Sequence, residues 1–173
     1  AGFETLGRLL AERADMAFEN DVTEAVLRPL HIEPRWLDPL PASAGLHATL
    51  DELLRFAQEL LSPTLIAPET LAEATSVQFP GLAGVLPDVG RFDPLDWGLG
   101  FELKDRKEPH WTGRLNSPRT FGHFGGSGTF LWVDPEAGVA LVCLSDHGFG
   151  PWALEAWLRL SDAVVGSDPV TRL

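Results

Sequence analysis

The sequence predicts an α+β protein, in which helices come first and a small antiparallel sheet with a closing helix follows. Apolar residues recur at helical spacing through most of the first part of the chain. Two β-prone runs, TFLWVD and VALVCL, then follow each other with only the short segment PEAG between them. A helical pattern, PWALEAWLRLSDAVV, returns after the second run and is expected to pack on the sheet.

The helical part is assigned to residues 1–75. A first helix over residues 3–13 has its apolar side chains on one face, and residues 19–30 continue as a second helix. A third helix follows a predicted capping box, because Thr49 is followed three residues later by Glu52, ahead of a wide apolar stripe. The segment APETLAEAT predicts a short fourth helix with its proline in the first turn.

Residues 76–96 are rich in glycine and proline and have no stable period, so they are predicted to form a long surface loop of the kind that often borders a site. Residues 97–173 then hold three predicted antiparallel strands and the closing helix. The strands are WGLGFEL over residues 97–103, TFLWVD and VALVCL, and Gly138 suits a tight hairpin between the last two. Three strands leave two open edges, so the sheet is predicted to be incomplete.

Composition excludes several classes of partner. The net charge is −12, from 13 basic and 25 acidic residues, which argues against nucleic acid or an anionic membrane as a partner. No run of about 18 apolar residues occurs, so no membrane span is predicted. The single cysteine, Cys143, lies in an apolar run and is expected to be a small buried side chain. The absence of a disulfide pair slightly favours the cytoplasm, although the chain opens on a helical pattern without an initiator methionine, so a missing signal peptide carries no weight.

The stretch RTFGHFGGSGTFLWVD places His123 directly ahead of a glycine-rich run that passes into a strand. The five histidines do not have metal-binding spacing, so no metal site is predicted. The glycine run precedes a strand, whereas a phosphate-binding loop follows a strand and opens a helix, so no nucleotide or other cofactor is predicted. Two interpretations remain. The run is a turn with His123 as a solvated cap, or it belongs to an acyl-transfer site whose glycines admit a substrate and free a backbone N–H for an oxyanion.

The region FGHFGGSGTFLWVDPEAGVALVCLSD resembles the third conserved region of the serine β-lactamase-like hydrolases, which include penicillin-binding proteins, class C-type β-lactamases, D-amino-acid peptidases and esterases. In many members His-x-Gly replaces Lys-Thr-Gly, and His123, Phe124 and Gly125 match it here. The helical segments and WGLGFEL resemble the parts of the family that precede this motif, except that a glycine usual near Asp15 is absent. The resemblance therefore covers nearly the whole chain and implies the C-terminal half of the β-lactamase/transpeptidase-like fold, as one domain portion over residues 1–173.

The resemblance also implies an activity and its missing parts. The family attacks an ester, amide or lactam with the serine of S-x-x-K, which is activated by that lysine and by the tyrosine of Y-x-N. This sequence has no tyrosine, and no serine in it is followed three positions later by lysine. The chain is therefore expected to be inactive alone, with an upstream segment carrying both motifs as its partner and a small acyl compound as its substrate.

The family's roles fall on five residues of this sequence. The N–H of Gly126, on an edge strand, would donate to the oxyanion, and His123 would tune the upstream proton network or bind a substrate carboxylate. Gly125 would give clearance, while Phe124 and Ser127 would flank the acyl group. Two alternatives remain: a non-catalytic relative that serves as a binding or interaction module, and a structural domain in which GHFGGSG is only a turn.

Overall fold

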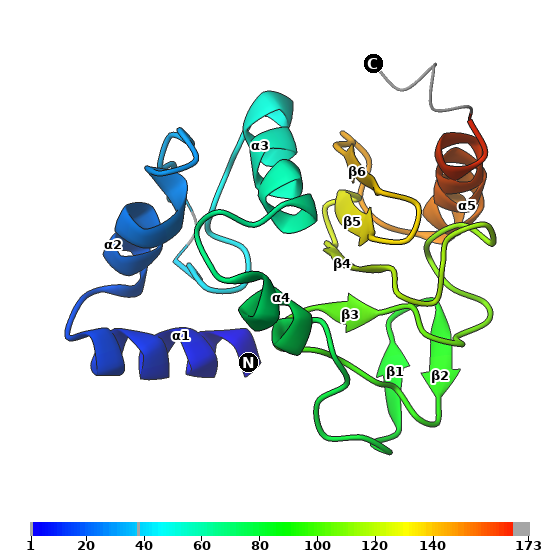
Figure 1. Cartoon of the computed structure of the whole chain (residues 1–173), viewed down its shortest axis with the longest axis horizontal. Coiled ribbons are helices and arrows are strands. Elements are labelled where there is room, and N and C mark those ends of the chain that lie inside the picture. Colours follow the sequence, from blue (N-terminus) through cyan, green and yellow to red (C-terminus); the bar gives the residue numbers. More distant parts are fainter. Residues whose placement is uncertain (1, 38, 168–173) are drawn as a thin grey trace. The chain divides into compact units, whose positions relative to one another are not determined.

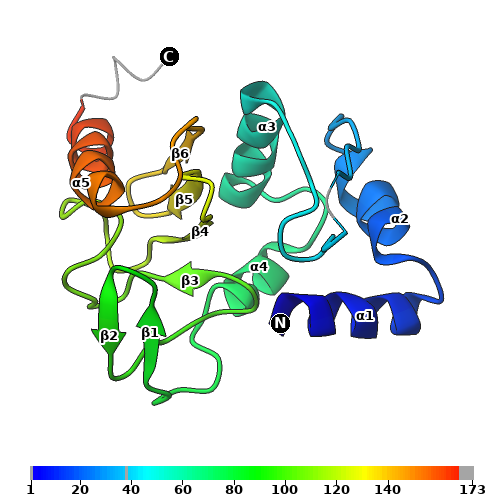
Figure 2. The same cartoon turned by 180° about the vertical axis from the view of Figure 1, so that it is seen from behind.

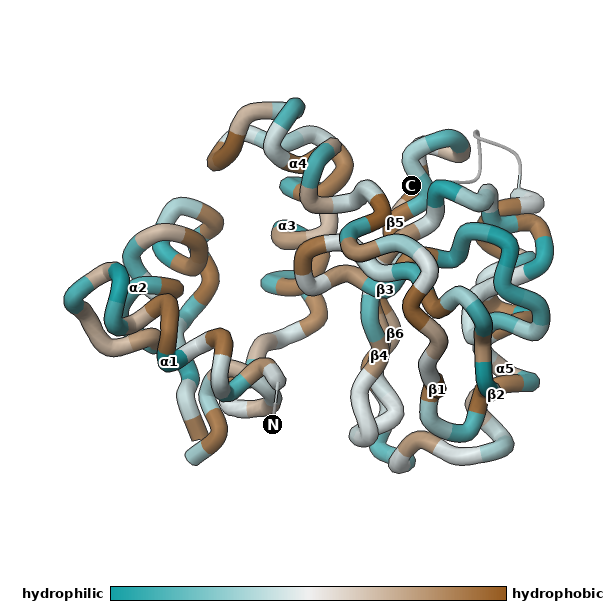
Figure 3. Tube along the Cα trace, turned by 90° about the horizontal axis from the view of Figure 1, so that it is seen from below, coloured by the Kyte–Doolittle hydropathy of each residue, from teal (hydrophilic) through white to brown (hydrophobic). Residues whose placement is uncertain are grey.

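The computed structural model describes residues 2–37 and 39–167, and the chain divides into two compact units, Ala1–Phe56 and Ala57–Leu173 (Figure 1). The first unit holds helix α1 (Gly2–Ala14), helix α2 (Phe18–Val22), the π-helical turn η1 (Thr23–Leu27) and the start of helix α3 (Leu50–Leu61). These are the helices that the sequence predicts. Figure 3 shows hydrophobic and hydrophilic residues mixed along α1 and α3, as expected for amphipathic helices.

The junction after α1 explains the departure from the family pattern at Asp15. Asp15 has a φ of 52°, which is the left-handed conformation that commonly ends a helix and that glycine adopts without strain. Aspartate is one of the few other residues that tolerate it. Asp15 thus adopts a backbone conformation that a glycine would also adopt.

The capping box at the start of α3 is confirmed, and its carboxylate does more than cap the helix. The backbone N–H of Thr49 donates to Glu52 Oε2 at 2.7 Å, and the backbone N–H of Glu52 donates to Thr49 Oγ1 at 3.4 Å. The same carboxylate accepts hydrogen bonds from the N–H of Glu33 at 3.0 Å and from Arg35 Nη1 at 2.7 Å. Glu52 therefore ties the proline-rich connection to the third helix.

The second unit contains helix α4 (Pro68–Ala74), a hairpin of β1 (Gly84–Leu86) and β2 (Gly90–Phe92), a four-stranded sheet and helix α5 (Pro151–Val165), seen from behind in Figure 2. The sheet is antiparallel throughout, and its strands follow in the order β3 (Glu102–Leu103), β4 (Phe121–Phe124), β5 (Phe130–Asp134) and β6 (Val139–Cys143). Helix α5 packs on this sheet, where Trp132 Nε1 donates to Ser161 Oγ at 3.0 Å. The α+β class, the order of elements and the packing of the closing helix are confirmed.

The predicted count of three strands is wrong for the main sheet, which has four, and the loop over residues 76–96 contains the β1–β2 hairpin. Strand β4 escaped prediction because Gly122 interrupts its pattern, yet a side chain there has no room: a Cβ would lie 2.1 Å from the carbonyl oxygen of Leu131 on β5. The predicted strand over residues 97–103 is reduced to its last two residues. Gly98 donates to the carbonyl of Phe101 at 2.9 Å and Gly100 has a φ of 83°, so the chain turns before β3 begins.

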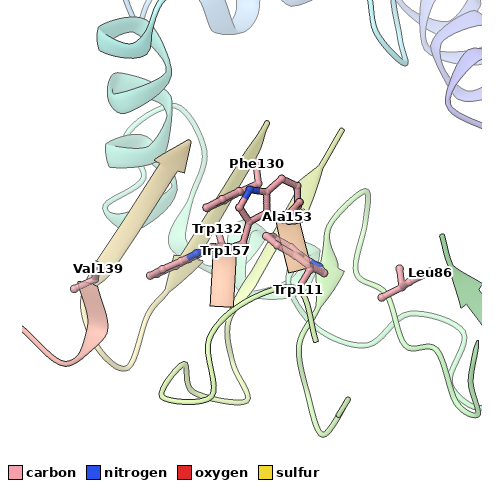
Figure 4. Packing of buried hydrophobic residues seen from close by; sticks show 7 residues of the cluster. All are labelled: Leu86, Trp111, Phe130, Trp132, Val139, Ala153 and Trp157. Atoms are coloured by element: carbon pink, nitrogen blue, oxygen red, sulfur yellow. The ribbon is translucent and has the colours of Figure 1, made fainter. Parts of the chain in front are cut away.

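The core of the second unit is aromatic. Trp111, Trp132 and Trp157 are at most 1% exposed and lie near Phe130, whose ring centroid is 4.8 Å from that of Trp157 (Figure 4). Phe124 reaches this core from β4, with its ring 5.4 Å from Trp111. Within the described ranges, every helix is too short or too polar to span a lipid bilayer.

Candidate active site

His123 lies at an open edge of the sheet. Strand β4 pairs with β5 along its whole length, but β3 pairs only with Phe121 and Gly122. His123 and Phe124 therefore extend past the end of β3. The exposed imidazole donates from Nδ1 to the carbonyl oxygen of Phe124 at 2.6 Å, because that oxygen can only accept, and its ring packs edge-on against Trp97 at 5.4 Å.

The glycine run after His123 is a tight turn, so Gly126 lies in the β4–β5 turn and the prediction that it sits on a strand is wrong. The N–H of Gly128 donates to the carbonyl of Gly125 at 3.0 Å, and this bond closes a β-turn over residues 125–128. Gly128 has a φ of 82°, and a Cβ on it would lie 1.8 Å from the carbonyl oxygen of His147. This close approach forces the chain to turn at this point.

Gly126 offers a backbone donor to any molecule placed beside the turn. Its carbonyl accepts from the N–H of Phe149 at 3.0 Å, whereas its own N–H has no acceptor within the described part of the chain. A Cβ added to Gly126 would meet nothing within 4 Å, so the space next to it is open. The turn thus combines a backbone N–H that has no described acceptor with open space beside the same residue.

That volume is a cavity of about 460 Å³ next to His123. It is lined by His123, Phe124 and Gly126 together with residues 85–88 of the hairpin, Trp97, Glu102 and Phe149. Three of the five predicted site residues thus meet at one cavity. Gly125 and Ser127 lie in the adjoining turn without lining it, and Ser127 Oγ is 3.0 Å from Thr129 Oγ1.

The other residues of the cavity wall come from segments that are separate in the sequence and are brought together by the fold. The loop over residues 76–96 was expected to border a site, and its hairpin does line the cavity. No pattern in the sequence points to Phe149, which lines the cavity and whose N–H donates to the carbonyl oxygen of Gly126. Trp97 was assigned to a strand. Its place beside His123 follows from the turn that ends before β3.

Behind the cavity lies a buried ionic network centred on Glu102, whose side chain is 1% exposed. Lys107 Nζ is 2.9 Å from Glu102 Oε1, while His110 Nε2 and Trp111 Nε1 lie 2.8 and 2.9 Å from Oε2. Burial alone would raise the pKa of Glu102, but the hydrogen bond from His110 and the charge of Lys107 outweigh it and hold that pKa below its usual value. Glu102 is therefore a carboxylate paired with an ammonium group.

His110 lies in a loop, yet it is only 7% exposed. Burial lowers the pKa of His110 more than its bond to Glu102 raises it, so the ring is neutral at neutral pH. The neutral ring donates from Nε2 to Glu102, and its Nδ1 accepts from the hydroxyl of Thr112 at 2.8 Å. Among the described residues, no group of three or more His, Cys, Asp and Glu side chains is arranged to hold a metal ion.

An antiparallel sheet packed against helix α5, with His-x-Gly at an open strand edge beside a cavity, is typical of the β-lactamase-like class of fold. The model of the Beta-lactamase family matches residues 1–164, and the chain belongs to this family. The crystal structure of a beta-lactamase from Mycobacterium bovis is similar, with 49% sequence identity and a TM-score of 0.89 over 95% of this chain and 61% of that protein. This chain therefore spans less than two thirds of the length of that relative.

A second similar structure is unliganded simvastatin synthase from Aspergillus terreus, with 16% identity and a TM-score of 0.63 over 94% of this chain and 52% of that one. At this identity the likeness concerns the fold alone. No curated protein matches the sequence.

Proposed function

We propose that this chain is the C-terminal portion of a serine hydrolase that forms an acyl-enzyme with an ester, amide or lactam. The observation that carries the proposal is that Gly126 lines the same cavity as His123, while its N–H has no acceptor among the described residues. When a serine attacks a carbonyl carbon, the carbonyl oxygen becomes negative, and a fixed N–H donor stabilises it. One such donor is worth about 3–4 kcal/mol of barrier.

The nucleophile comes from another segment in this proposal. The sequence has neither S-x-x-K nor any tyrosine. Ser127 is the serine nearest to His123 in sequence, but its Oγ bonds Thr129 and not a base that would activate it. An upstream segment with both motifs is the partner, and His123 tunes the proton network of its lysine and tyrosine. The chain alone then has no covalent catalysis.

A second candidate is a binding module without catalysis. It is favoured by one observation: a cavity forms from residues of this chain, and none of the described residues that line it is a serine, threonine, cysteine or lysine. The two candidates differ in what happens when a catalytic segment is supplied.

The test is a chimera in which this chain replaces the matching part of the M. bovis beta-lactamase. We expect the chain alone to leave a chromogenic ester and a chromogenic cephalosporin intact. The chimera should hydrolyse at least one of them and show an acyl adduct by intact-mass spectrometry. A hydrolysis rate of the purified chain without any second polypeptide would overturn the proposal, and a folded but inactive chimera would favour the binding module.

A pair of substitutions in the chimera tests the oxyanion role. Gly126→Pro removes the N–H at the second position of a β-turn, where proline is favoured, and should lower kcat by about a hundredfold or more. Gly126→Ala keeps the N–H and has room for its methyl group, so it should stay within about threefold of the parent chimera. Equal losses in both variants would show that Gly126 acts through the shape of the turn and not as a donor.

A further inference from the structure

The cavity beside His123 has mostly apolar walls that are held in place. Leu86, Trp97, Phe124 and Phe149 line it, and its volume of about 460 Å³ is within the usual range for small-molecule sites. The ring of Phe124 lies 4.7 Å from that of Phe149 and 5.4 Å from that of buried Trp111. Such a preformed aromatic wall favours a bulky apolar group over a small polar one.

The charges around the cavity disfavour an anion. Asp88 and Glu102 are the acidic side chains in its wall, and none of the described lining residues is lysine or arginine. The cation paired with Glu102 is Lys107, whose side chain is only 4% exposed. Its ammonium group forms an ion pair with Glu102 Oε1 and donates to the carbonyl oxygens of Asp96 and Leu103. Lys107 is therefore buried among its own partners and is not among the residues that line the cavity.

His123 also lines the cavity, but its Nδ1 hydrogen is donated to the carbonyl oxygen of Phe124 and is not available to a ligand. A carboxylate in this cavity would lose water and gain no ionic partner, and it would lie near the unpaired charge of exposed Asp88. An uncharged apolar group has no charge to desolvate and is not repelled by Asp88.

We propose that this cavity binds a bulky apolar group without a negative charge, so that neutral esters or amides are preferred over substrates that carry a carboxylate there. The inference rests on the proposed function only in calling this group part of a substrate. It decides between the two roles that the sequence left open for His123, in favour of the one that does not bind a carboxylate.

The test measures binding to the 173-residue chain, which needs no catalysis. Three ligands of nearly equal size serve as probes: 4-phenylbutanamide, 4-phenylbutanoate and 4-phenylbutylammonium. By ligand-observed NMR titration at neutral pH, the amide should bind at least about fivefold more tightly than the carboxylate, and the ammonium at least as tightly as the amide. Equal or tighter binding of the carboxylate, or no binding of the amide to the folded chain at millimolar concentration, would overturn the inference.

Charge variants at exposed positions keep the test independent of folding. Asp88 has a φ of 58°, which asparagine also tolerates, so Asp88→Asn should narrow the gap between amide and carboxylate without disturbing the hairpin. Val85 is 61% exposed and lines the cavity. Val85→Arg should raise the affinity for the carboxylate about tenfold, while Val85→Gln, of similar length and uncharged, should not. Equal effects of Arg and Gln would contradict a charge-based preference.

A wall variant locates the binding site. Phe149→Ala should weaken amide binding about tenfold, whereas Phe79→Ala, at a residue that is 77% exposed and outside the cavity wall, should not. Equal losses in the two variants would place the amide elsewhere. If the chimera described above is inactive but the amide still binds, the inference stands and the hydrolase proposal fails. An active chimera that prefers carboxylate-bearing substrates would support the hydrolase proposal and contradict the inference about the cavity.

Discussion

Gly122 and Gly126 lie on either side of His123 and have opposite surroundings. A Cβ on Gly122 would lie 2.1 Å from the backbone oxygen of Leu131, whereas a Cβ on Gly126 would meet nothing within 4 Å. The obstacle at Gly122 is backbone in the neighbouring strand, so it cannot be relieved by a side-chain rotation. Glycine is therefore required at Gly122 by the β4–β5 spacing.

We predict that Gly122→Ala destabilises the chain by roughly 1–3 kcal/mol or more, because β4 and β5 must separate to admit the methyl group. Gly126→Ala is the matched control and should change the free energy of unfolding by about 0.5 kcal/mol or less. Urea denaturation followed by tryptophan fluorescence measures both. Equal stability of the two variants would mean that the sheet opens at this point without cost.

At the scale of single elements, the start of α3 shows how a local signal can be tested. The Thr49 hydroxyl contacts both the N–H and the carboxylate of Glu52. We predict that Thr49→Ala costs about 1 kcal/mol, as for other N-cap residues. Thr70→Ala, inside α4, removes the same groups from an exposed site that caps nothing and should not destabilise the chain. An equal loss of unfolding free energy in Thr70→Ala and Thr49→Ala would show that Thr49 does not stabilise the chain as a helix cap.

The same local character explains which elements could be predicted. Helices α1, α3 and α5 follow from the 3.6-residue period, and the cap of α3 follows from two residues three positions apart. The β1–β2 hairpin could not be found in this way, because each strand has only three residues. Strand β4 could not be found either, because Gly122 is required by the close approach of Leu131 on another strand.

The candidate site also has a part that could be predicted from the sequence and a part that could not. His123, Phe124 and Gly126 could be named from the sequence, because the His-x-Gly region resembles a known motif. The turn that holds Gly126 depends on the approach of Gly128 to His147, and the far wall of the cavity depends on Phe149. These contacts join separate segments, so no pattern within one segment reports them.

At the scale of the whole molecule, two effects of acid oppose each other. The net charge of −12 becomes smaller as carboxylates and histidines take up protons, and this relieves repulsion within the folded chain. The buried network has the opposite effect. Burial lowers the pKa of His110, so the unfolded chain binds a proton near pH 6.5 that the folded chain does not.

The sign of the His110 effect follows from this linkage. Its contribution to stability is fully present above about pH 6.5 and is lost as the pH falls toward the lower pKa of the folded state. The slope contributed by one such proton is at most about 1.4 kcal/mol per pH unit. Glu102, whose pKa is also lowered, contributes stability that is lost only in stronger acid, as the pH falls below about 4.5.

We therefore predict that His110→Gln lowers stability at pH 7 but flattens its decline between pH 7 and pH 5. The free energy of unfolding from urea titrations at several pH values measures this slope. His47→Gln, at an exposed position, is the matched control for the loss of one histidine. Equal slopes for His110→Gln and the parent would show that the buried histidine is not the group that makes the fold sensitive to acid.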